Sequence, residues 1–200
     1  MLKIFFFLLF SCGINAQQLE SLKTLKTKHD SIETQLKLKY QEEIKGKSES
    51  EISEIYYQNL LSRSKNNRER LDHYFSAVQT FLETQKLIGP SQEAAQQEIP
   101  DKTANYSQGF PALYKEVHDF IKNRYQDRLD EFFTKSAKIH FIVQNDHSLY
   151  IEKVEGTEKE FNDLALLAFL MTTGKWESAF QRGMNVKSKF VLPVKFVVEE

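Results

Sequence analysis

Side chains able to do chemistry are present in this chain, but their spacing matches no catalytic motif. The sequence contains no H-E-x-x-H, G-x-S-x-G, G-x-x-x-x-G-K-[ST] or C-x-x-C pattern. The neighbouring carboxylates Glu42-Glu43 and Asp130-Glu131 are typical of solvated helix faces rather than of acid–base pairs. The sequence therefore predicts neither an enzyme nor a metal or cofactor site. The five histidines are scattered along the chain: His29, His73, His118, His140 and His147.

Composition excludes two further classes of protein. The 200 residues include 27 basic and 28 acidic side chains, so the formal net charge of −1 provides no basic field for nucleic acid or an anionic membrane. A hydrophobic fraction of 40% is enough for a packed core. The mean hydropathy of −0.50 excludes a polytopic membrane protein. With only 7 Gly and 4 Pro, long regular elements are expected.

The chain begins with a segment typical of a secretory signal peptide. Lys3 precedes an apolar run from Ile4 to Phe10, and we expect cleavage after Ala16. As a helix, an apolar run of about eleven residues reaches about 16 Å, against about 30 Å of membrane hydrocarbon, so no stable transmembrane anchor is predicted. The alternative is a lipoprotein, because Leu9-Phe10-Ser11-Cys12 resembles a lipobox whose cysteine would be acylated.

The number and position of cysteines help to predict the cellular compartment of the protein. Cys12 is the single cysteine of the sequence, so a chain cleaved after Ala16 has no thiol and no disulfide. An exported protein without cysteines is compatible with a periplasm. The predicted location is therefore the periplasm of a Gram-negative envelope.

Residues 17–88 are predicted to form helices. This stretch has one glycine, Gly46, and no proline, and its apolar residues recur at spacings of three and four. Gly46, followed by Ser48 and Glu51, predicts a helix break and then a capping box. His29 falls on the apolar stripe, where a lone histidine is expected to set the helix register or to be half exposed. We expect an antiparallel hairpin or one side of an oligomeric coiled coil, acting as a spacer, an oligomerisation stalk or a partner-docking helix.

A polar linker and then a second domain follow. Residues 89–109 open with Gly89-Pro90 and predict the linker. Within residues 110–200 a helix begins at Phe110-Pro111. Alternating apolar residues then predict a hairpin that turns at Asp146-His147, where a positive φ is tolerated.

The end of the chain predicts one more helix and one more strand. Thr157 with Glu160 predicts a capping box at the start of an apolar helix. Trp176 follows and is expected to be buried between this helix and the sheet. The chain then turns again and enters a last strand over residues 187–198, with alternating apolar residues. Because proline cannot donate to a ladder, Pro193 indicates that this strand lies at a sheet edge or carries a bulge.

The order helix, hairpin, helix, tryptophan turn and proline-bearing strand resembles the C-terminal domain of the TonB energy-transducing family over residues 105–198. The resemblance implies an α+β fold with two helices on a three-stranded antiparallel sheet, preceded here by an α-helical or coiled-coil region. Three features depart from the family pattern: His147 stands in a hairpin turn that is usually Asp-Gly, the Tyr-Pro-x-x-Ala that often follows the first helix appears as Tyr125-Gln126-Asp127-Arg128-Leu129, and Ser178 stands where proline usually follows the tryptophan. The residues that carry the resemblance are Trp176, Gly183, Phe190, Pro193 and Phe196.

The resemblance also implies a way of binding. In TonB-like domains the last strand receives a short segment of an outer-membrane receptor, by β-strand pairing. Two other uses of the same edge are a strand merely protected against aggregation and a homodimer formed by self-pairing. The candidate partner-binding residues are Lys187, Lys189, Phe190, Val191, Leu192, Pro193, Val194 and Lys195.

Two functions remain open at the level of the sequence. The first is a periplasmic protein–protein interaction module that supports outer-membrane transport by pairing a strand with its partner. The sequence shows neither an uncleaved membrane helix nor a Pro-rich spacer, both of which energy transduction requires, so the resemblance implies the fold and the binding mode. The alternative is a structural or scaffolding envelope protein that oligomerises through residues 17–88.

Overall fold

The computed structural model describes residues 2–90, 100–124 and 133–198, with side chains over 20–90, 100–124 and 134–197. The fold is mixed α+β, with antiparallel strands. The chain divides into a helical unit, Glu20–Gln79, and a C-terminal unit that comprises Thr80–Glu200 together with Met1–Leu19. Within the described residues, no helix combines the length and the apolar character needed to cross a membrane.

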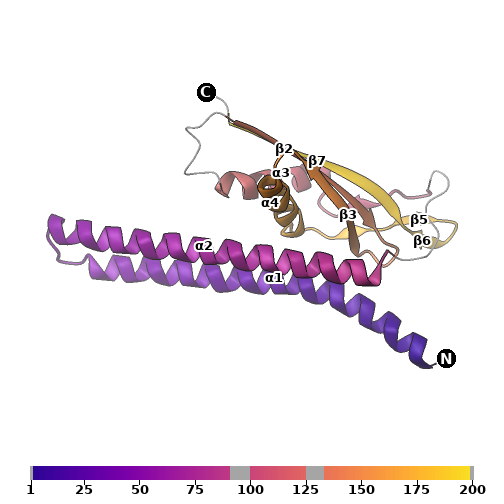
Figure 1. Cartoon of the computed structure of the whole chain (residues 1–200), viewed down its shortest axis with the longest axis horizontal. Coiled ribbons are helices and arrows are strands. Elements are labelled where there is room, and N and C mark those ends of the chain that lie inside the picture. The colour runs from indigo at the N-terminus through magenta and orange to yellow at the C-terminus, as the bar shows by residue number, and fades with distance from the viewer. Residues whose placement is uncertain (1, 91–99, 125–132, 199–200) are drawn as a thin grey trace. The chain divides into compact units, whose positions relative to one another are not determined.

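Two long helices supply the helical unit. α1 (Leu2–Glu43) and α2 (Glu49–Ile88) run antiparallel and are joined by a turn in which Gly46 has a φ of +71° (Figure 1). The Ser48 N–H and hydroxyl donate to the carboxylate of Glu51 at 3.0 and 2.8 Å, and these bonds lower the pKa of Glu51 to about 2. The predicted break is confirmed, and Glu51 makes the carboxylate half of the predicted capping box.

Polar contacts between α1 and α2 fix the register of the hairpin. His29 is 1% exposed, and its Nδ1 lies 2.8 Å from Asn66 Oδ1 while its Nε2 lies 3.1 Å from His73 Nδ1. The expectation of a lone histidine is therefore wrong. Sequence spacing could not pair positions 44 residues apart. Nearer the turn, Arg63 binds Glu33 at 2.6 Å.

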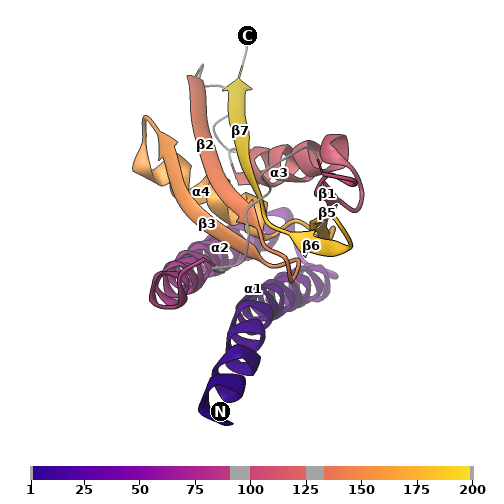
Figure 2. The same ribbon diagram turned by 90° about the vertical axis from the view of Figure 1, so that its right-hand side faces the viewer.

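A three-stranded antiparallel sheet forms the framework of the C-terminal unit. β2 (Phe133–Val143) is central, flanked by β3 (Leu149–Gly156) and by β7 (Ser188–Val198), in the order β3-β2-β7 (Figure 2). The β2–β3 register shifts at a bulge between His140 and Phe141. His147 has a φ of 69° in the hairpin turn, as expected from its position.

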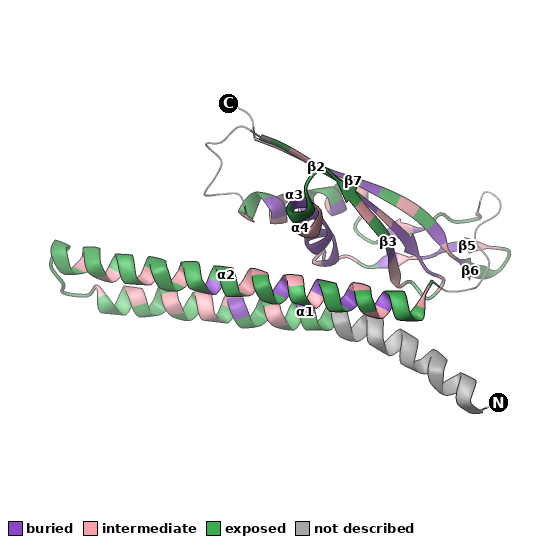
Figure 3. Ribbon diagram, in the orientation of Figure 1, coloured by how far each residue is buried: buried purple, intermediate pink, exposed green. Residues whose placement is uncertain are grey.

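Two helices cover one face of this sheet. α3 (Phe110–Arg124) contacts β7, whereas α4 (Lys159–Leu170) contacts β2 and β3, and the two helices also contact each other. Most of α4 is buried, and Figure 3 shows the buried residues gathering where the helices meet the sheet. The predicted capping box of this helix is wrong, because Glu158 is the N-cap and makes no side-chain capping bond.

Four short strands complete the C-terminal unit. β1 (Asn105–Tyr106) pairs with β4 (Trp176–Glu177), and β5 (Ala179–Gln181) pairs with β6 (Met184–Val186). The end of the predicted linker is therefore structured, with Tyr106 fully buried. A two-residue strand is too short to show periodicity, which explains the difference. Residues 91–99 of that linker lie outside the described residues.

The end of α2 belongs to the C-terminal unit rather than to the helical unit. The unit boundary falls between Gln79 and Thr80, so the last turns of α2 lie beyond it. Phe81 and Gln85 are buried there at 4% and 3% exposure. The expected domain boundary at residue 88 therefore moves to residue 80, and this segment takes part in the candidate site.

Candidate strand-binding edge

β7 alternates between a core face and a solvent face. Leu192, Val194 and Phe196 are buried beneath α3 and α4, with Phe190 half-buried beside them. Val191, Pro193 and Lys195 are exposed on the opposite face, as is Lys189. The candidate binding residues of this strand therefore fall into two groups. The even-numbered residues contribute side chains to the core, and the odd-numbered residues of the strand face solvent. Lys187 lies just before the strand and is half-buried.

The direction of the backbone groups in β2 follows from the hairpin. In a strand, the N–H and C=O of one residue point to the same side and those of the next residue point to the other. The Gln144 N–H donates to the Ser148 carbonyl at 2.8 Å, so the even-numbered residues that precede it in β2 turn their backbone toward β3. The odd-numbered residues of β2, such as Phe141, consequently turn theirs toward β7.

The same alternation determines which groups of β7 are left at the edge. Phe141 pairs with Phe190, so the even-numbered residues of β7 bond to β2. The backbone groups of the odd-numbered residues, Val191 among them, then point away from the sheet. Within the described ranges, no strand other than β2 pairs with β7. β7 is therefore an edge strand whose outward groups are positioned to receive another strand.

Pro193 is placed on the outward side. Its partner across the ladder is Lys138, an even-numbered residue whose backbone turns toward β3. The N–H that proline lacks would have pointed to the open edge, so Pro193 removes no bond between β7 and β2. This explains how a proline occupies the middle of an eleven-residue strand.

The opposite edge of the sheet is closed at the beginning of β3 by a side chain. The Gln85 amide donates from Nε2 to the Leu149 carbonyl at 2.6 Å and accepts at Oε1 from the Ile151 N–H at 3.0 Å. These two groups belong to odd-numbered residues of β3, which turn away from β2 because Tyr150 pairs with Ile142. The amide of Gln85 thus takes the two bonds that a neighbouring strand would make. The residues around it gave no signal of this role, because Gln85 sits in an ordinary helical sequence.

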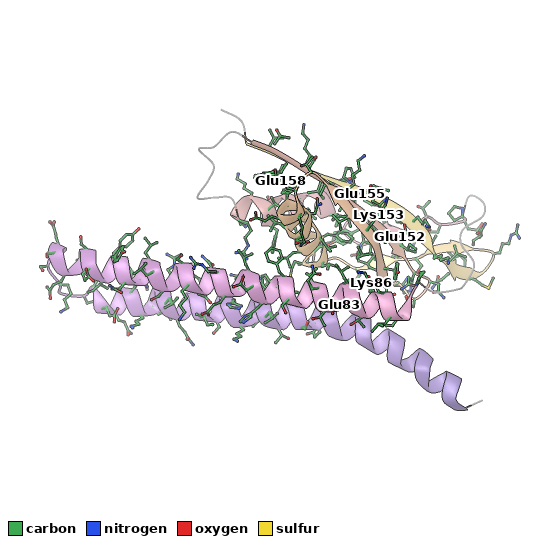
Figure 4. All side chains as sticks on the ribbon, viewed as in Figure 1. Glu83, Lys86, Glu152, Lys153, Glu155 and Glu158 are labelled. Carbon is green, nitrogen blue, oxygen red and sulfur yellow. The ribbon has the colours of Figure 1, made fainter. Side chains whose placement is uncertain are left out.

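Charged side chains bridge the solvent face of the sheet. Lys189 Nζ of β7 lies 2.6 Å from Glu152 Oε1 of β3, across the central strand. Glu155 binds Lys153 at 2.5 Å and His140 at 2.9 Å, and the Lys153 bond is the main reason that the pKa of Glu155 is lowered. Figure 4 labels the glutamates and Lys153 of this face, together with Glu83 and Lys86 near the end of α2.

An aromatic cluster supports β7 from the core side. Trp176 is 7% exposed, and its ring centroid lies 5.1 Å from Phe141 and 5.8 Å from Phe190. The predicted burial of Trp176 is confirmed. Gly174 is required beside it, because a Cβ there would lie 2.2 Å from the Tyr106 ring, whose hydroxyl accepts the Gly174 N–H.

Two of the three features that depart from the TonB-like pattern, His147 and Ser178, contact each other, and the third, at residues 125–129, lies outside the described residues. His147 Nδ1 accepts the Ser178 N–H at 3.0 Å, and the Ser178 hydroxyl donates to the Gln144 carbonyl at 2.6 Å. Glycine at 147 would have no side chain for this contact and proline at 178 would have no N–H. The two substitutions therefore join the β2–β3 turn to the segment that follows Trp176.

On the solvent face lies a shallow depression of about 490 Å³ that is open to water, and exposed residues such as Lys138, Glu155 and Lys195 line it. No group of three or more histidine, cysteine, aspartate or glutamate side chains is arranged for a metal ion among the residues described.

Comparisons with known proteins add no family to this geometry. No protein-family model, no curated protein and no solved structure matches the chain. What the site can do follows from its own atoms, which form a sheet with one edge partly closed by Gln85 and with the edge of β7 open.

Proposed function

We propose that the C-terminal unit is a protein-binding module that adds an extended segment of its partner to the edge of β7. The observation that carries the proposal is the direction of the odd-numbered backbone groups of β7, which point away from β2. A peptide strand pairing there would gain main-chain hydrogen bonds, as in other cases of β-strand addition. The Gln85 amide blocks the beginning of the β3 edge, and we infer that β7 is the side of the sheet that accepts such a strand.

The exposed side chains of β7 define the chemistry of the partner. Val191 is 52% exposed and lies two residues from Pro193, so the middle of the strand is apolar. Lys189 and Lys195 are exposed on either side of this apolar centre. A partner segment with apolar residues in its middle and acidic residues toward its ends complements this pattern.

The TonB-like resemblance supports a setting for this binding. It covers the tryptophan turn and the proline-bearing strand, and the sheet order β3-β2-β7 with two helices on one face agrees with what it implies. The contact between His147 and Ser178 gives a local reason for two of the three departures. We infer a periplasmic module that supports outer-membrane transport, with a receptor segment as the strand it receives.

Export is part of the same proposal. The apolar run that follows Lys3 directs the chain to the periplasm, with cleavage after Ala16. The intact mass of the protein isolated from the envelope tests this directly, and a chain beginning at Gln17 is the expected result. A mass that includes Met1, or a lipid on Cys12, would contradict it.

One substitution in β7 tests strand pairing. Val191→Pro removes an outward N–H and leaves the bonds from β7 to β2 intact, so it should abolish capture of the partner from a native envelope extract. Val191→Thr keeps the N–H and the branched shape and is the matched control. Undiminished capture by the proline variant would show that the partner binds elsewhere.

A second function is favoured by a different observation. The helical unit exposes several large apolar side chains, including Tyr57 and Leu61, on α2. Exposed apolar patches of this kind often mark contact surfaces. This observation supports the scaffold alternative, in which the protein oligomerises through its helical unit.

A further inference from the structure

Tyr57 and Leu61, two exposed apolar residues of α2, lie away from α1. The side of α2 that meets α1 is identified by Asn59, which donates to the Leu36 carbonyl, and by Arg63, which binds Glu33. Leu61 stands midway between Asn59 and Arg63 in the sequence and so points to the other side of a helix with about 3.6 residues per turn. It is 47% exposed, so no part of the described chain covers it fully.

Leu61 belongs to a stripe of four residues on α2 that runs from an acidic residue through two apolar residues to a basic residue. Glu54, Tyr57, Leu61 and Lys65 follow one another at spacings of three and four, which places them on one face of α2. The acid stands at one end, the base at the other, and the two apolar residues lie between. Leu60 lies beside the apolar centre and is also about half exposed, whereas Tyr56 packs against Tyr40 of α1, with ring centroids 6.2 Å apart.

We propose that this Tyr57 stripe is the contact surface for a second copy of the chain, docked antiparallel on the same stripe. A twofold axis near residue 59 would place Glu54 opposite Lys65 of the second copy and Tyr57 opposite its Leu61. Every position then meets a complementary one, as a self-matching twofold interface requires. A parallel dimer would instead set Glu54 against Glu54 and Lys65 against Lys65. The inference deepens the scaffold function and does not depend on strand pairing at β7.

The charged residues at the two ends of the stripe already make contacts within α2. Those contacts are weak enough to be exchanged for contacts with a second copy of the chain. Glu54 accepts from Gln58 at 2.9 Å, and Lys65 lies 3.9 Å from Glu69, with both lysine and glutamate exposed. Exposed pairs one helical turn apart contribute little. The apolar centre is smaller than the interfaces of about 1,200–2,000 Å² typical of stable complexes, so the dimer should have a dissociation constant of about 1–100 μM.

Sedimentation velocity of the full chain as isolated after export tests this surface. The wild type should pass from monomer to dimer as its concentration rises, and Leu61→Glu should remain monomeric. Leu38→Glu is the matched control, because Leu38 is 56% exposed on α1 outside the stripe, and it should dimerise like the wild type. A wild type that stays monomeric throughout, or a Leu61→Glu dimer, would overturn the proposal.

A charge exchange tests the antiparallel orientation with little risk to folding. Glu54→Lys and Lys65→Glu should each weaken dimerisation by about tenfold, and combining them in one chain should restore it. Failure of the double variant to recover would reject the antiparallel arrangement. The assay contains no strand-binding partner, so its outcome is independent of what β7 binds. Dimerisation that resists Leu61→Glu but is lost with Val191→Pro would assign self-pairing to β7 instead.

Discussion

The two edges of the central sheet are chemically different. At β3, the Gln85 amide bonds both to the Leu149 carbonyl and to the Ile151 N–H, and Gln85 is almost fully buried. At β7, the outward backbone groups face away from the sheet, and the one group deleted from that edge is the N–H absent from Pro193. The side chain of Gln85 protects one sheet edge, and a similar side chain could equally have protected the other edge. The difference between the edges is the basis for assigning recognition to β7.

The difference also shows how an open edge avoids indiscriminate pairing. Pro193 interrupts the row of donors, and the lysines of β7 repel a second copy of the same strand. Under the proposed function, such a strand would still accept a segment whose acidic residues meet those lysines. The following predictions change one edge, or its support, at a time.

The largest effect is expected from Trp176, which supports the β7 side of the sheet. Trp176→Ala removes a buried aromatic that contacts Phe141 and Phe190, so it should lower the free energy of unfolding by about 3–5 kcal/mol. Trp176→Phe should cost less, because the buried Trp176 Nε1 has no hydrogen-bond partner among the described residues. Denaturant titration measures both, and equal stability of the alanine variant and the wild type would show that the cluster does not support β7.

Opening the β3 edge should have the next largest effect. Gln85→Leu keeps the approximate size of the side chain but leaves the Ile151 N–H and the Leu149 carbonyl without their amide partner. We expect a loss of about 2–3 kcal/mol and concentration-dependent association through β3. Lys86→Leu is the control, since Lys86 is exposed on the same helix turn. Unchanged stability of the Gln85 variant would mean that water closes this edge as well as the amide does.

The hairpin turn offers a smaller test that involves neither edge. His147→Gly keeps a residue that tolerates positive φ but loses the contact with Ser178, so it should cost about 1 kcal/mol. In the His147→Gly background, adding Ser178→Pro should cost less than it does in the wild type, because the contact with His147 is already absent, but it still removes the hydroxyl bond to the Gln144 carbonyl. Thermal unfolding of the two single variants and the double variant measures the coupling, and strictly additive losses would contradict it.

The smallest effect is expected on the solvent face. Lys189→Ala removes an ion pair with Glu152 in which the lysine side chain is 69% exposed, so stability should fall by less than about 1 kcal/mol. Partner binding should weaken modestly, because a pairing strand uses mainly backbone groups. A loss of binding as large as that caused by Val191→Pro would show that the lysine, rather than the ladder, dominates recognition.

Local patterns made the open edge predictable from the sequence. The alternation from Phe190 to Phe196 and the proline within it are features of one continuous segment, and both survive in the structure. Burial of Trp176 and the positive φ of His147 were likewise predictable, because they follow from residue type and immediate neighbours.

The role of Gln85 at the β3 edge could not be predicted from local sequence patterns. Gln85 lies more than sixty residues from its partners in β3, in a helical stretch whose polar residues give no sign of which side chain is buried. Separations of 44 and 31 residues likewise hid the contact between His29 and His73 and that between His147 and Ser178. Each depends on tertiary packing, which hydrophobic periodicity does not encode.

Residue-resolved amide exchange of the full chain tests the difference between the edges most directly. We predict slow exchange at Ile151, which the Gln85 amide protects, and fast exchange at Val191, with slow exchange again at Leu192 because it bonds to β2. Addition of the strand partner should then slow exchange at Val191 and at Lys195. A Val191 amide already protected in the free protein, or one that stays unprotected when the partner is bound, would contradict strand addition at β7.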